Sequence, residues 1–182
     1  MDLKNLQKIL EQKTEAPVHL WNPEYCGEMD LQINADGSWW YMGSEITRKR
    51  LIKLFSRVIK KEQNEYFLVT PVEKLKIEVE DYPFIANWLD IVEDPSQPHP
   101  WLILKTNVGD QIKLDKNTPL VVNTDDKGTP IPIIKVRANL YAKLSRSVFY
   151  ELVEMSENWD NNGKLHSRVF SGTDWFDLGS QE

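Results

Sequence analysis

The chain has 182 residues, of which 41% are hydrophobic and 27% charged, and its formal net charge is −6. This length supports one ordinary domain or two small packed domains, and the hydrophobic share excludes a disordered chain. The negative charge argues against general nucleic-acid binding, because a phosphate-binding surface dominates the charge of a small domain. A local anion site remains compatible with it.

The N-terminal residues interleave acids and lysines with leucines and an isoleucine, so they lack the basic start and continuous apolar segment of a signal peptide. Residues 1–20 are predicted to form an amphipathic helix instead. No run of about 18 apolar residues occurs, so we expect no membrane span. The single cysteine, Cys26, has no partner for an internal disulfide, which favours a reducing compartment. We therefore expect a cytoplasmic protein.

Residues 27–42 predict a β-hairpin, because apolar and polar residues alternate and the Asp-Gly pair at 36–37 is typical of a two-residue turn. A turn of this length places Trp40 on the core face. Trp39 and Tyr41 are then predicted to lie on the opposite face, away from the core.

Two helices and several further strands follow from residue spacing. Residues 47–61 predict a helix with Thr47 as its N-cap and an apolar stripe extending to Ile59. A second helix is predicted after an N-cap at Ser145. The remaining strands are predicted at residues 66–69, 75–79, 85–92, 101–105, 111–114, 120–123 and 134–140. Residues 165–178 are predicted to form a final pair of strands or one bent strand.

The order of these elements predicts an α+β fold in which two halves each contain a strand, a capped helix and a returning strand. Such a pattern indicates duplication, although strand-helix-strand order also recurs by chance in α+β proteins. We expect a first domain at 21–82 and a second at 83–182.

A search for catalytic chemistry yields no site. His19, His99 and His166 are far apart in sequence and belong to no metal-binding motif, and no nucleotide-binding glycine loop or nucleophile elbow is present. Cys26 has the chemistry of a thiol nucleophile, but a lone cysteine is more typical of an ordinary buried residue. We predict no catalytic residue, no cofactor and no metal.

The most unusual local feature is a run of seven basic residues between positions 48 and 61 without one acid. Three of them, Arg48, Lys49 and Arg50, begin the predicted helix, where positive charge opposes the helix dipole. A bound anion would explain them. The alternatives are a solvated polar face and a contact with an acidic partner.

Aromatic residues beside this basic run suggest a nucleotide-like ligand, because an exposed ring stacks a base while a neighbouring cation holds phosphate. The alternative is that another domain covers the rings. A second basic pair flanks the later strand-to-helix corner, and both corners would meet at a cleft if the two halves pack face to face. The candidate ligand-binding residues are Trp39, Tyr41, Arg48, Lys49, Arg137 and Arg146.

Four segments together resemble a bacterial domain-of-unknown-function family, number 1285: CGEMDLQINADGSWWYMGSEITRKRLIKLF, YFLVTPVEKLKIEVEDYPF, VRANLYAKLSRSVFYELVE and SGTDWFDLG. The resemblance implies two domains with duplicated motifs, a pleckstrin-homology-like second domain, a ligand site between the domains, a nucleotide-like ligand and a role in signal transduction. At Glu45 this chain departs from a proline common in the family. The family's recurring positions correspond here to Gly37, Trp39, Tyr41, Gly43, Arg48, Pro71, Glu73, Pro83, Phe84, Arg137, Arg146 and Glu151.

The favoured function is therefore a non-enzymatic module that binds a small phosphorylated, nucleotide-like ligand in a cleft between its halves. One alternative is an adaptor that engages another protein through a strand edge or the basic helix. Another is a small hydrolase, which clustered groups with perturbed pKa values in a closed pocket would indicate.

Overall fold

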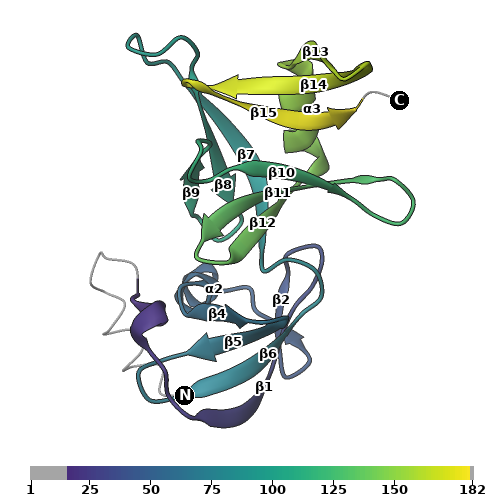
Figure 1. Ribbon diagram of the computed structural model, residues 1–182. Coiled ribbons are helices and arrows are strands. Elements are labelled where there is room, and N and C mark those ends of the chain that lie inside the picture. Colours follow the sequence, from purple (N-terminus) through teal and green to yellow (C-terminus); the bar gives the residue numbers. More distant parts are fainter. Residues whose placement is uncertain (1–15, 181–182) are drawn as a thin grey trace. The chain divides into compact units, whose positions relative to one another are not determined.

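The computed structural model describes residues 16–180 and contains two compact units, which are joined between Pro83 and Phe84. Both consist mainly of strands in mixed and antiparallel sheets with few helices (Figure 1). One sheet is curled into a half-barrel. The predicted N-terminal helix of residues 1–20 lies mostly outside the described residues, which begin just before a single 3-10 turn, η1 (Val18–Leu20).

The N-terminal unit is built around one mixed sheet with strand order β3-β2-β1-β6-β5-β4. Its first strand, β1, runs parallel to its last, β6, and the other neighbours are antiparallel. Helix α2 follows β3. The elements are β1 (Tyr25–Ile33), β2 (Trp39–Tyr41), β3 (Ser44–Glu45), α2 (Lys49–Ser56), β4 (Ile59–Glu62), β5 (Glu65–Val69) and β6 (Lys74–Val79).

The predicted hairpin forms, but its predicted register is wrong by one residue. Asn34 N–H donates to the Ser38 carbonyl at 3.0 Å, so three residues rather than two make the turn. The third, Gly37, has a φ of 82°, a left-handed conformation that glycine adopts without strain. Trp39 consequently pairs with Ile33 and is fully buried. The face that Trp39 shares with Tyr41 is therefore the core face.

Helix α2 is shorter than predicted and lacks the predicted cap. Arg48 occupies the N-cap position without a side-chain capping bond, so Thr47 is not the cap. The helix ends at Ser56, and Ile59 begins strand β4. The spacing of Ile59 from earlier apolar residues suits a helix, which is why the sequence predicts it to be helical. Its burial in the sheet satisfies that apolar pattern equally well.

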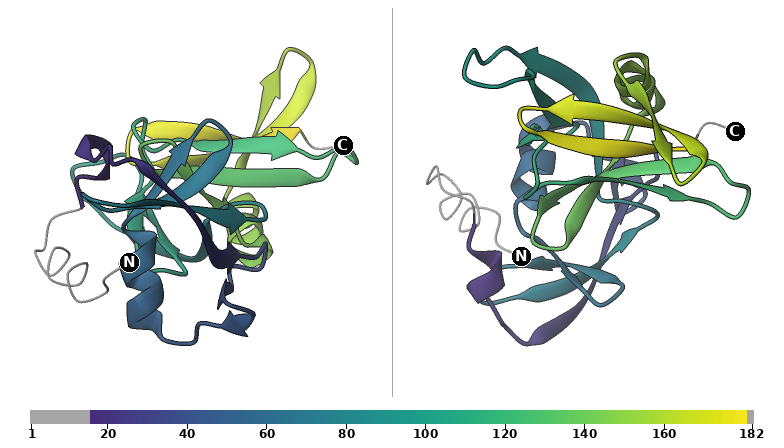
Figure 2. Two further views of the ribbon diagram at one scale, coloured as in Figure 1. Left: turned by 90° about the horizontal axis from the view of Figure 1, so that it is seen from below. Right: turned by 45° about the horizontal axis from the view of Figure 1, so that its top comes forward.

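The C-terminal unit contains a six-stranded sheet with order β10-β11-β12-β7-β8-β9, a three-stranded sheet with order β13-β14-β15, and helix α3. Figure 2 shows this unit from two further sides. Again the first and last strands of the larger sheet, β7 and β12, are parallel neighbours. The elements are β7 (Phe84–Val92), β8 (Trp101–Thr106), β9 (Gln111–Lys113), β10 (Leu120–Thr124), β11 (Pro130–Arg137), β12 (Leu140–Leu144), α3 (Arg146–Glu154), β13 (Glu157–Asn161), β14 (Lys164–Ser171) and β15 (Asp174–Ser180).

One predicted strand of this unit is two strands. The segment 134–140 contains a turn, because Ala138 has a φ of 46° and separates β11 from β12. The turn has no glycine or proline, and Asn139 is its only typical turn residue, so the sequence carries only a weak turn signal there. Strand β13 was not predicted, since its residues are mostly polar.

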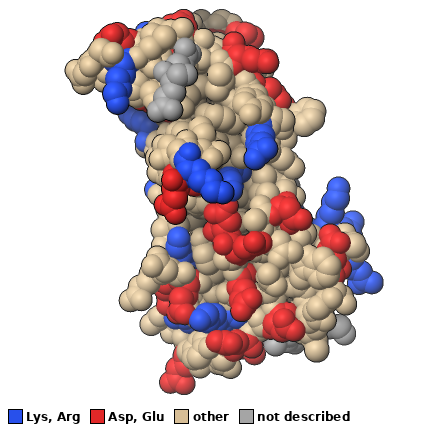
Figure 3. Space-filling view, turned by 90° about the vertical axis from the view of Figure 1, so that its right-hand side faces the viewer, with Lys and Arg blue, Asp and Glu red and all other residues tan. Residues whose placement is uncertain are grey.

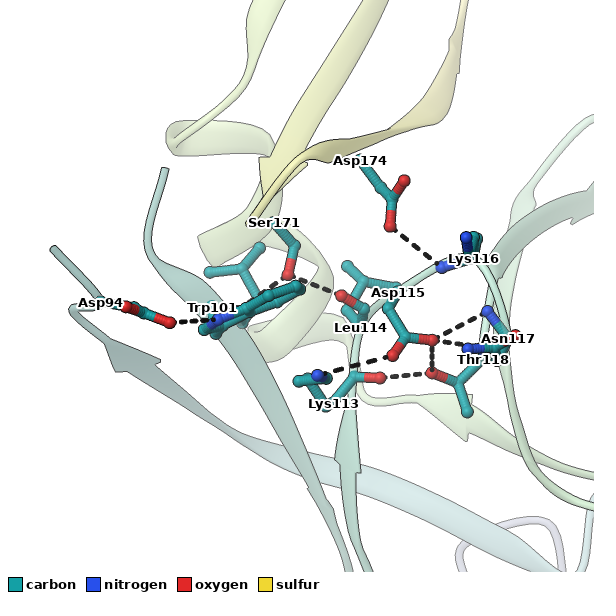
Figure 4. Close-up of polar contacts among 11 residues, drawn as sticks. Asp94, Trp101, Lys113, Leu114, Asp115, Lys116, Asn117, Thr118, Ser171 and Asp174 are labelled. Atoms are coloured by element: carbon teal, nitrogen blue, oxygen red, sulfur yellow. Dashed lines mark hydrogen bonds and ion pairs between the residues drawn. The ribbon is translucent and has the colours of Figure 1, made fainter. Parts of the chain in front are cut away.

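Hydrogen bonds within a polar cluster connect the three-stranded sheet to the larger sheet (Figure 4). The fully buried Ser171 accepts a hydrogen bond from Leu102 N–H at 3.1 Å and donates to the Leu114 carbonyl at 2.7 Å. Beside it, Gly172 lies so close to Trp101 that an added Cβ would meet the indole ring at 2.3 Å. The end of β14 is therefore held firmly against β8 and the residues after β9.

Candidate ligand-binding site

The first predicted basic corner lies at the start of α2. Arg48 and Lys49 are exposed, and the side chain of neither forms a hydrogen bond or ion pair with another residue in the range 16–180. No acidic residue lies in the first helical turn. Positive charge at this corner is thus uncompensated by the described part of the chain.

The two aromatic candidates do not join this corner as expected. Trp39 is fully buried, so its ring is not available for stacking on a ligand. Tyr41 is 41% exposed and lines a groove of about 410 Å³ with Ile46 and Leu51. Neither Arg48 nor Lys49 lines that groove, whose wall is mainly apolar. The structure therefore does not combine the predicted rings and cations in this groove.

Arg137, the third predicted cation, is engaged within the C-terminal unit. Its guanidinium lies 3.2 Å from an Asp110 carboxylate oxygen, and it stacks 5.0 Å from the centre of the Phe84 ring. The side chain is 20% exposed. A partly buried, paired arginine of this kind contributes to the packing around β7 and is less available to a ligand.

Arg146 lines a cavity of about 470 Å³ at the start of α3. The walls come from the turn between β10 and β11, from β11, from the end of β12 and from the first turn and a half of α3. In Figure 1 the β10–β11 turn extends outward from the sheet. The lining residues are Asp125, Thr129, Pro130, Ile131, Pro132, Lys143, Leu144, Arg146, Phe149 and Tyr150.

Local structure fixes the orientation of α3 beside this cavity. Ser145 is the N-cap, as predicted, because its hydroxyl accepts a hydrogen bond from Val148 N–H at 3.3 Å. Val148 and Leu152 are buried, and the helix packs on β7 and β14. With that side against the sheets, Phe149 and Tyr150 line the cavity together with Arg146, which lies three and four residues earlier on the helix.

The cavity holds one carboxylate and two cations. Asp125 accepts hydrogen bonds from the backbone N–H groups of Thr129 and Lys127, and these bonds lower the pKa of its carboxyl below the ordinary value. Lys143 lies near enough to lower that pKa further. Asp125 is therefore ionised at neutral pH, and Lys143 and Arg146 leave the lining with one positive charge in excess.

This arrangement suits an anion attached to a flat or apolar group. Arg146 is exposed and has no ion pair within the described residues, so its planar fork of donors is available to a phosphate. Tyr150, 62% exposed, offers a ring face at the same cavity. The volume is within the range of typical small-molecule sites.

Sequence reasoning identified Arg146 but missed the residues that surround it. Phe149 and Tyr150 follow at helical spacing from Arg146, and this signal was available in the sequence. Lys143 and Asp125 carried no comparable signal. Their position depends on the β10–β11 turn folding beside the end of β12, which no local pattern specifies.

The described residues contain no group of three or more histidine, cysteine, aspartate and glutamate side chains placed to hold a metal ion. In the same part of the chain, no helix is long and apolar enough to cross a membrane.

The fold defines a two-unit protein of mixed sheets, and its second unit contains a cavity beside the start of α3. The chain belongs to the DUF1285 family. Residues 16–82 match the model described as "Domain of unknown function (DUF1285), N-terminal domain", and residues 83–178 match "Protein of unknown function (DUF1285), C-terminal domain". The resemblance inferred from sequence segments is thereby confirmed.

Two solved structures are similar to this chain. A DUF1285 family protein from Silicibacter pomeroyi DSS-3 is 35% identical, with a TM-score of 0.82 over 97% of this chain and 93% of that one. A DUF1285 family protein from Shewanella baltica OS155 is 28% identical, with a TM-score of 0.55 over 69% of this chain and 91% of that one. No curated protein matches the chain.

Proposed function

We propose that this protein is a non-enzymatic module whose C-terminal unit binds a small phosphorylated, nucleotide-like ligand in the cavity beside Arg146. The observation that carries the proposal is the meeting of Arg146, Lys143 and Tyr150 around one cavity of about 470 Å³. A role in signal transduction, implied by the family resemblance, is part of the same proposal. The participation of Arg48 and Lys49 stays a prediction.

Phosphate recognition is the first step of the argument. Arg146 begins α3, where the amide groups of the helix start carry partial positive charge. Ser145 satisfies one of these amides, and the Arg146 guanidinium adds a full charge at the same place. Charge-assisted hydrogen bonds from arginine to phosphate are roughly twice as strong as neutral ones.

Recognition of the organic part is the second step. The rings of Phe149 and Tyr150 lie on the same side of α3 as Arg146, so a ligand with phosphate at Arg146 reaches a ring with its base. A long nucleic acid is disfavoured by the net charge of −6. On the face shown in Figure 3, acidic side chains are interspersed with basic ones, without a continuous basic surface.

Carboxylate chemistry supports a binding role over a hydrolase. The described carboxyl groups with shifted pKa values include Glu62, Asp90 and Asp125, and lysine partners or backbone N–H donors lower the pKa of each. A general acid requires the opposite shift, which keeps its proton near neutral pH.

We also propose that the two six-stranded sheets arose by duplication and that the C-terminal unit is pleckstrin-homology-like. The common strand order supports duplication, since in each sheet the first and last strands form a central parallel pair. The curled sheet and helix α3 support the second part. An experimental structure whose two sheets fail to superpose over their six strands would contradict the duplication.

The ligand proposal is tested by thermal denaturation of the full chain with a panel of nucleoside monophosphates, diphosphates, triphosphates and cyclic nucleotides. A ligand at 100 times its Kd stabilises the folded state by about 2.7 kcal/mol. We expect at least one nucleotide to raise Tm, and Arg146→Ala and Lys143→Ala to reduce that shift.

Arg137→Lys is the matched control, because Arg137 is paired with Asp110 and does not line the cavity. It keeps the charge and should leave the ligand-induced shift unchanged. A panel without any shift would overturn the proposal, and so would a shift that persists in Arg146→Ala.

A further inference from the structure

The cavity beside Arg146 contains a carboxylate that phosphate binding alone does not require. Asp125 lines the cavity together with Lys143 and Arg146. A carboxylate in such a place repels every additional negative charge that a ligand brings. Asp125 therefore limits which phosphorylated ligands the cavity accepts.

Backbone groups of the β10–β11 turn hold Asp125 in a fixed orientation. Asp125 Oδ1 accepts hydrogen bonds from Thr129 N–H at 2.8 Å and from Lys127 N–H at 2.9 Å, and the Thr129 side chain donates a further one. These bonds lower the pKa of the carboxyl. An ionised carboxylate accepts about four hydrogen bonds, so Asp125 retains capacity for a donor group of a ligand.

The charge balance of the cavity suits a ligand with a single negative charge. Lys143 and Arg146 exceed Asp125 by one positive charge. A phosphate diester carries one negative charge, whereas a terminal phosphate carries about −1.5 to −2 at neutral pH, and each further phosphate adds to that. Within a cavity of about 470 Å³ the additional charges would lie close to the Asp125 carboxylate and be repelled.

The start of α3 offers few backbone donors to a chain of phosphates. Glycine-rich loops bind polyphosphates through several successive backbone N–H groups. Here the Ser145 hydroxyl accepts from Val148 N–H, and the Ser145 carbonyl accepts from Phe149 N–H. The residues that line the cavity include no glycine. Phosphate at this place is therefore held mainly by the side chains of Lys143 and Arg146, which suffice for one phosphate group.

The rest of the cavity wall is largely apolar. A second or third phosphate placed against this wall would lose its water without gaining a hydrogen-bond partner, which is costly. A nucleoside loses less, because its base is flat and stacks on aromatic rings. The apolar and aromatic lining residues are Pro130, Ile131, Pro132, Leu144, Phe149 and Tyr150.

On the basis of the proposed function, we infer that the ligand of this cavity is a cyclic mononucleotide, in which one phosphate diester carries the only negative charge. Lys143 and Arg146 hold the diester. Asp125 accepts a hydrogen bond from a ribose hydroxyl or from a base amino group. The same carboxylate thus recognises the bound ligand and excludes ligands with more phosphates.

Calorimetric titration of the full chain at constant ionic strength tests the inference. The probes are cyclic AMP and cyclic GMP, each compared with the linear monophosphate and the triphosphate of the same nucleoside. Magnesium is left out, so that the triphosphate keeps its full charge. We expect at least one cyclic nucleotide to bind more tightly than its linear monophosphate. Its Kd should be about tenfold or more below that of the triphosphate, which brings like charges near Asp125.

Asp125→Asn removes the charge but keeps an oxygen that accepts the backbone N–H groups of the turn. The ratio of the triphosphate Kd to the cyclic nucleotide Kd should then fall about tenfold. Asp94→Asn is the matched control, because Asp94 lies beside Trp101 (Figure 4), accepts a hydrogen bond from Ser96 N–H at 3.0 Å and does not line the cavity. Both variants have the same net charge, so a long-range charge effect would change both ratios equally.

The possible results distinguish this class of ligand from the wider proposed function. A triphosphate or linear monophosphate that binds the wild type as tightly as the cyclic nucleotide would overturn the inference and leave nucleotide binding beside Arg146 standing. A Kd ratio that stays unchanged in Asp125→Asn would do the same. Binding of no nucleotide at all would overturn both. If Asp125→Asn fails to fold, the ranking of ligands by the wild type decides alone.

Discussion

Helices α2 and α3 begin in different ways, although each has a basic residue at its first position. Lys49 begins α2 after an N-cap residue, Arg48, that makes no side-chain capping bond. Arg146 begins α3 after Ser145, whose hydroxyl accepts from Val148 N–H. One helix start thus lacks any local stabilisation from its own sequence, and the other is capped.

The difference shows that basic residues at a helix start do not by themselves tell how that helix is stabilised. At α3 the cap supplies stability of its own, so Arg146 is free to act at the adjacent cavity. At α2 three successive cations oppose the helix dipole, and burial of Phe55 must hold the helix in place. We expect α2 to depend on packing and α3 to depend on both packing and capping.

The largest effect is expected from Phe55→Ala. Phe55 is 3% exposed, and its removal should lower the free energy of unfolding by about 3–5 kcal/mol. Urea denaturation followed by circular dichroism measures this change. Lys53→Ala, on the exposed side of the same helix, should change stability by no more than about 0.5 kcal/mol.

If Phe55→Ala lowered the free energy of unfolding by less than about 1 kcal/mol, burial of the Phe55 ring would not be what stabilises α2. The comparison between the two helices would then fail at its first step. A large effect in Lys53→Ala would contradict it as well, because that side chain is exposed.

Removal of the cap should have a smaller effect and should separate the helices. Ser145→Ala is expected to cost about 1 kcal/mol, because Val148 N–H loses its acceptor. Thr47→Ala is the matched change before α2, and it should be nearly neutral since Arg48 holds the N-cap position. Thermal and urea denaturation of both variants check the pair. Equal losses of stability in Ser145→Ala and Thr47→Ala would mean that Thr47 caps α2.

The sequence predicted the elements better than their registers and ends. Apolar patterns correctly predicted a hairpin within residues 27–42 and a helix after Ser145. Alternation and helical spacing are local properties of the sequence, so they can be read without the tertiary structure. The sheet face predicted for Trp39 was wrong, because one extra turn residue moves every side chain of the following strand to the opposite face of the sheet. A local Asp-Gly signal does not fix the turn length.

The candidate site was only partly predictable for the same reason. Arg146 was found because it stands at a helix start, which is a local feature. Lys143 was not found, because its role depends on where the distant β10–β11 turn folds. Arg137 was selected for its charge, but its pairing with Asp110 is a contact between residues 27 positions apart. Such contacts are set by tertiary structure.

Charge reversal in α2 should give the smallest effects and the most specific test of the dipole argument. Lys49→Glu places an acid in the first turn and should stabilise the protein by about 0.3–1 kcal/mol. Lys53→Glu, in the last turn of the same helix, should destabilise it by a similar or smaller amount. The two variants have the same net charge, so a general charge effect would move both in one direction.

Opposite signs that shrink together in 1 M salt would support the dipole argument, because the Debye length falls to about 3 Å. Changes of equal sign would contradict it and assign the effect to the net charge. If Lys49→Glu alone were neutral, the start of α2 would not be destabilised by its positive charge. The contrast drawn between an uncompensated α2 and a capped α3 would then be lost.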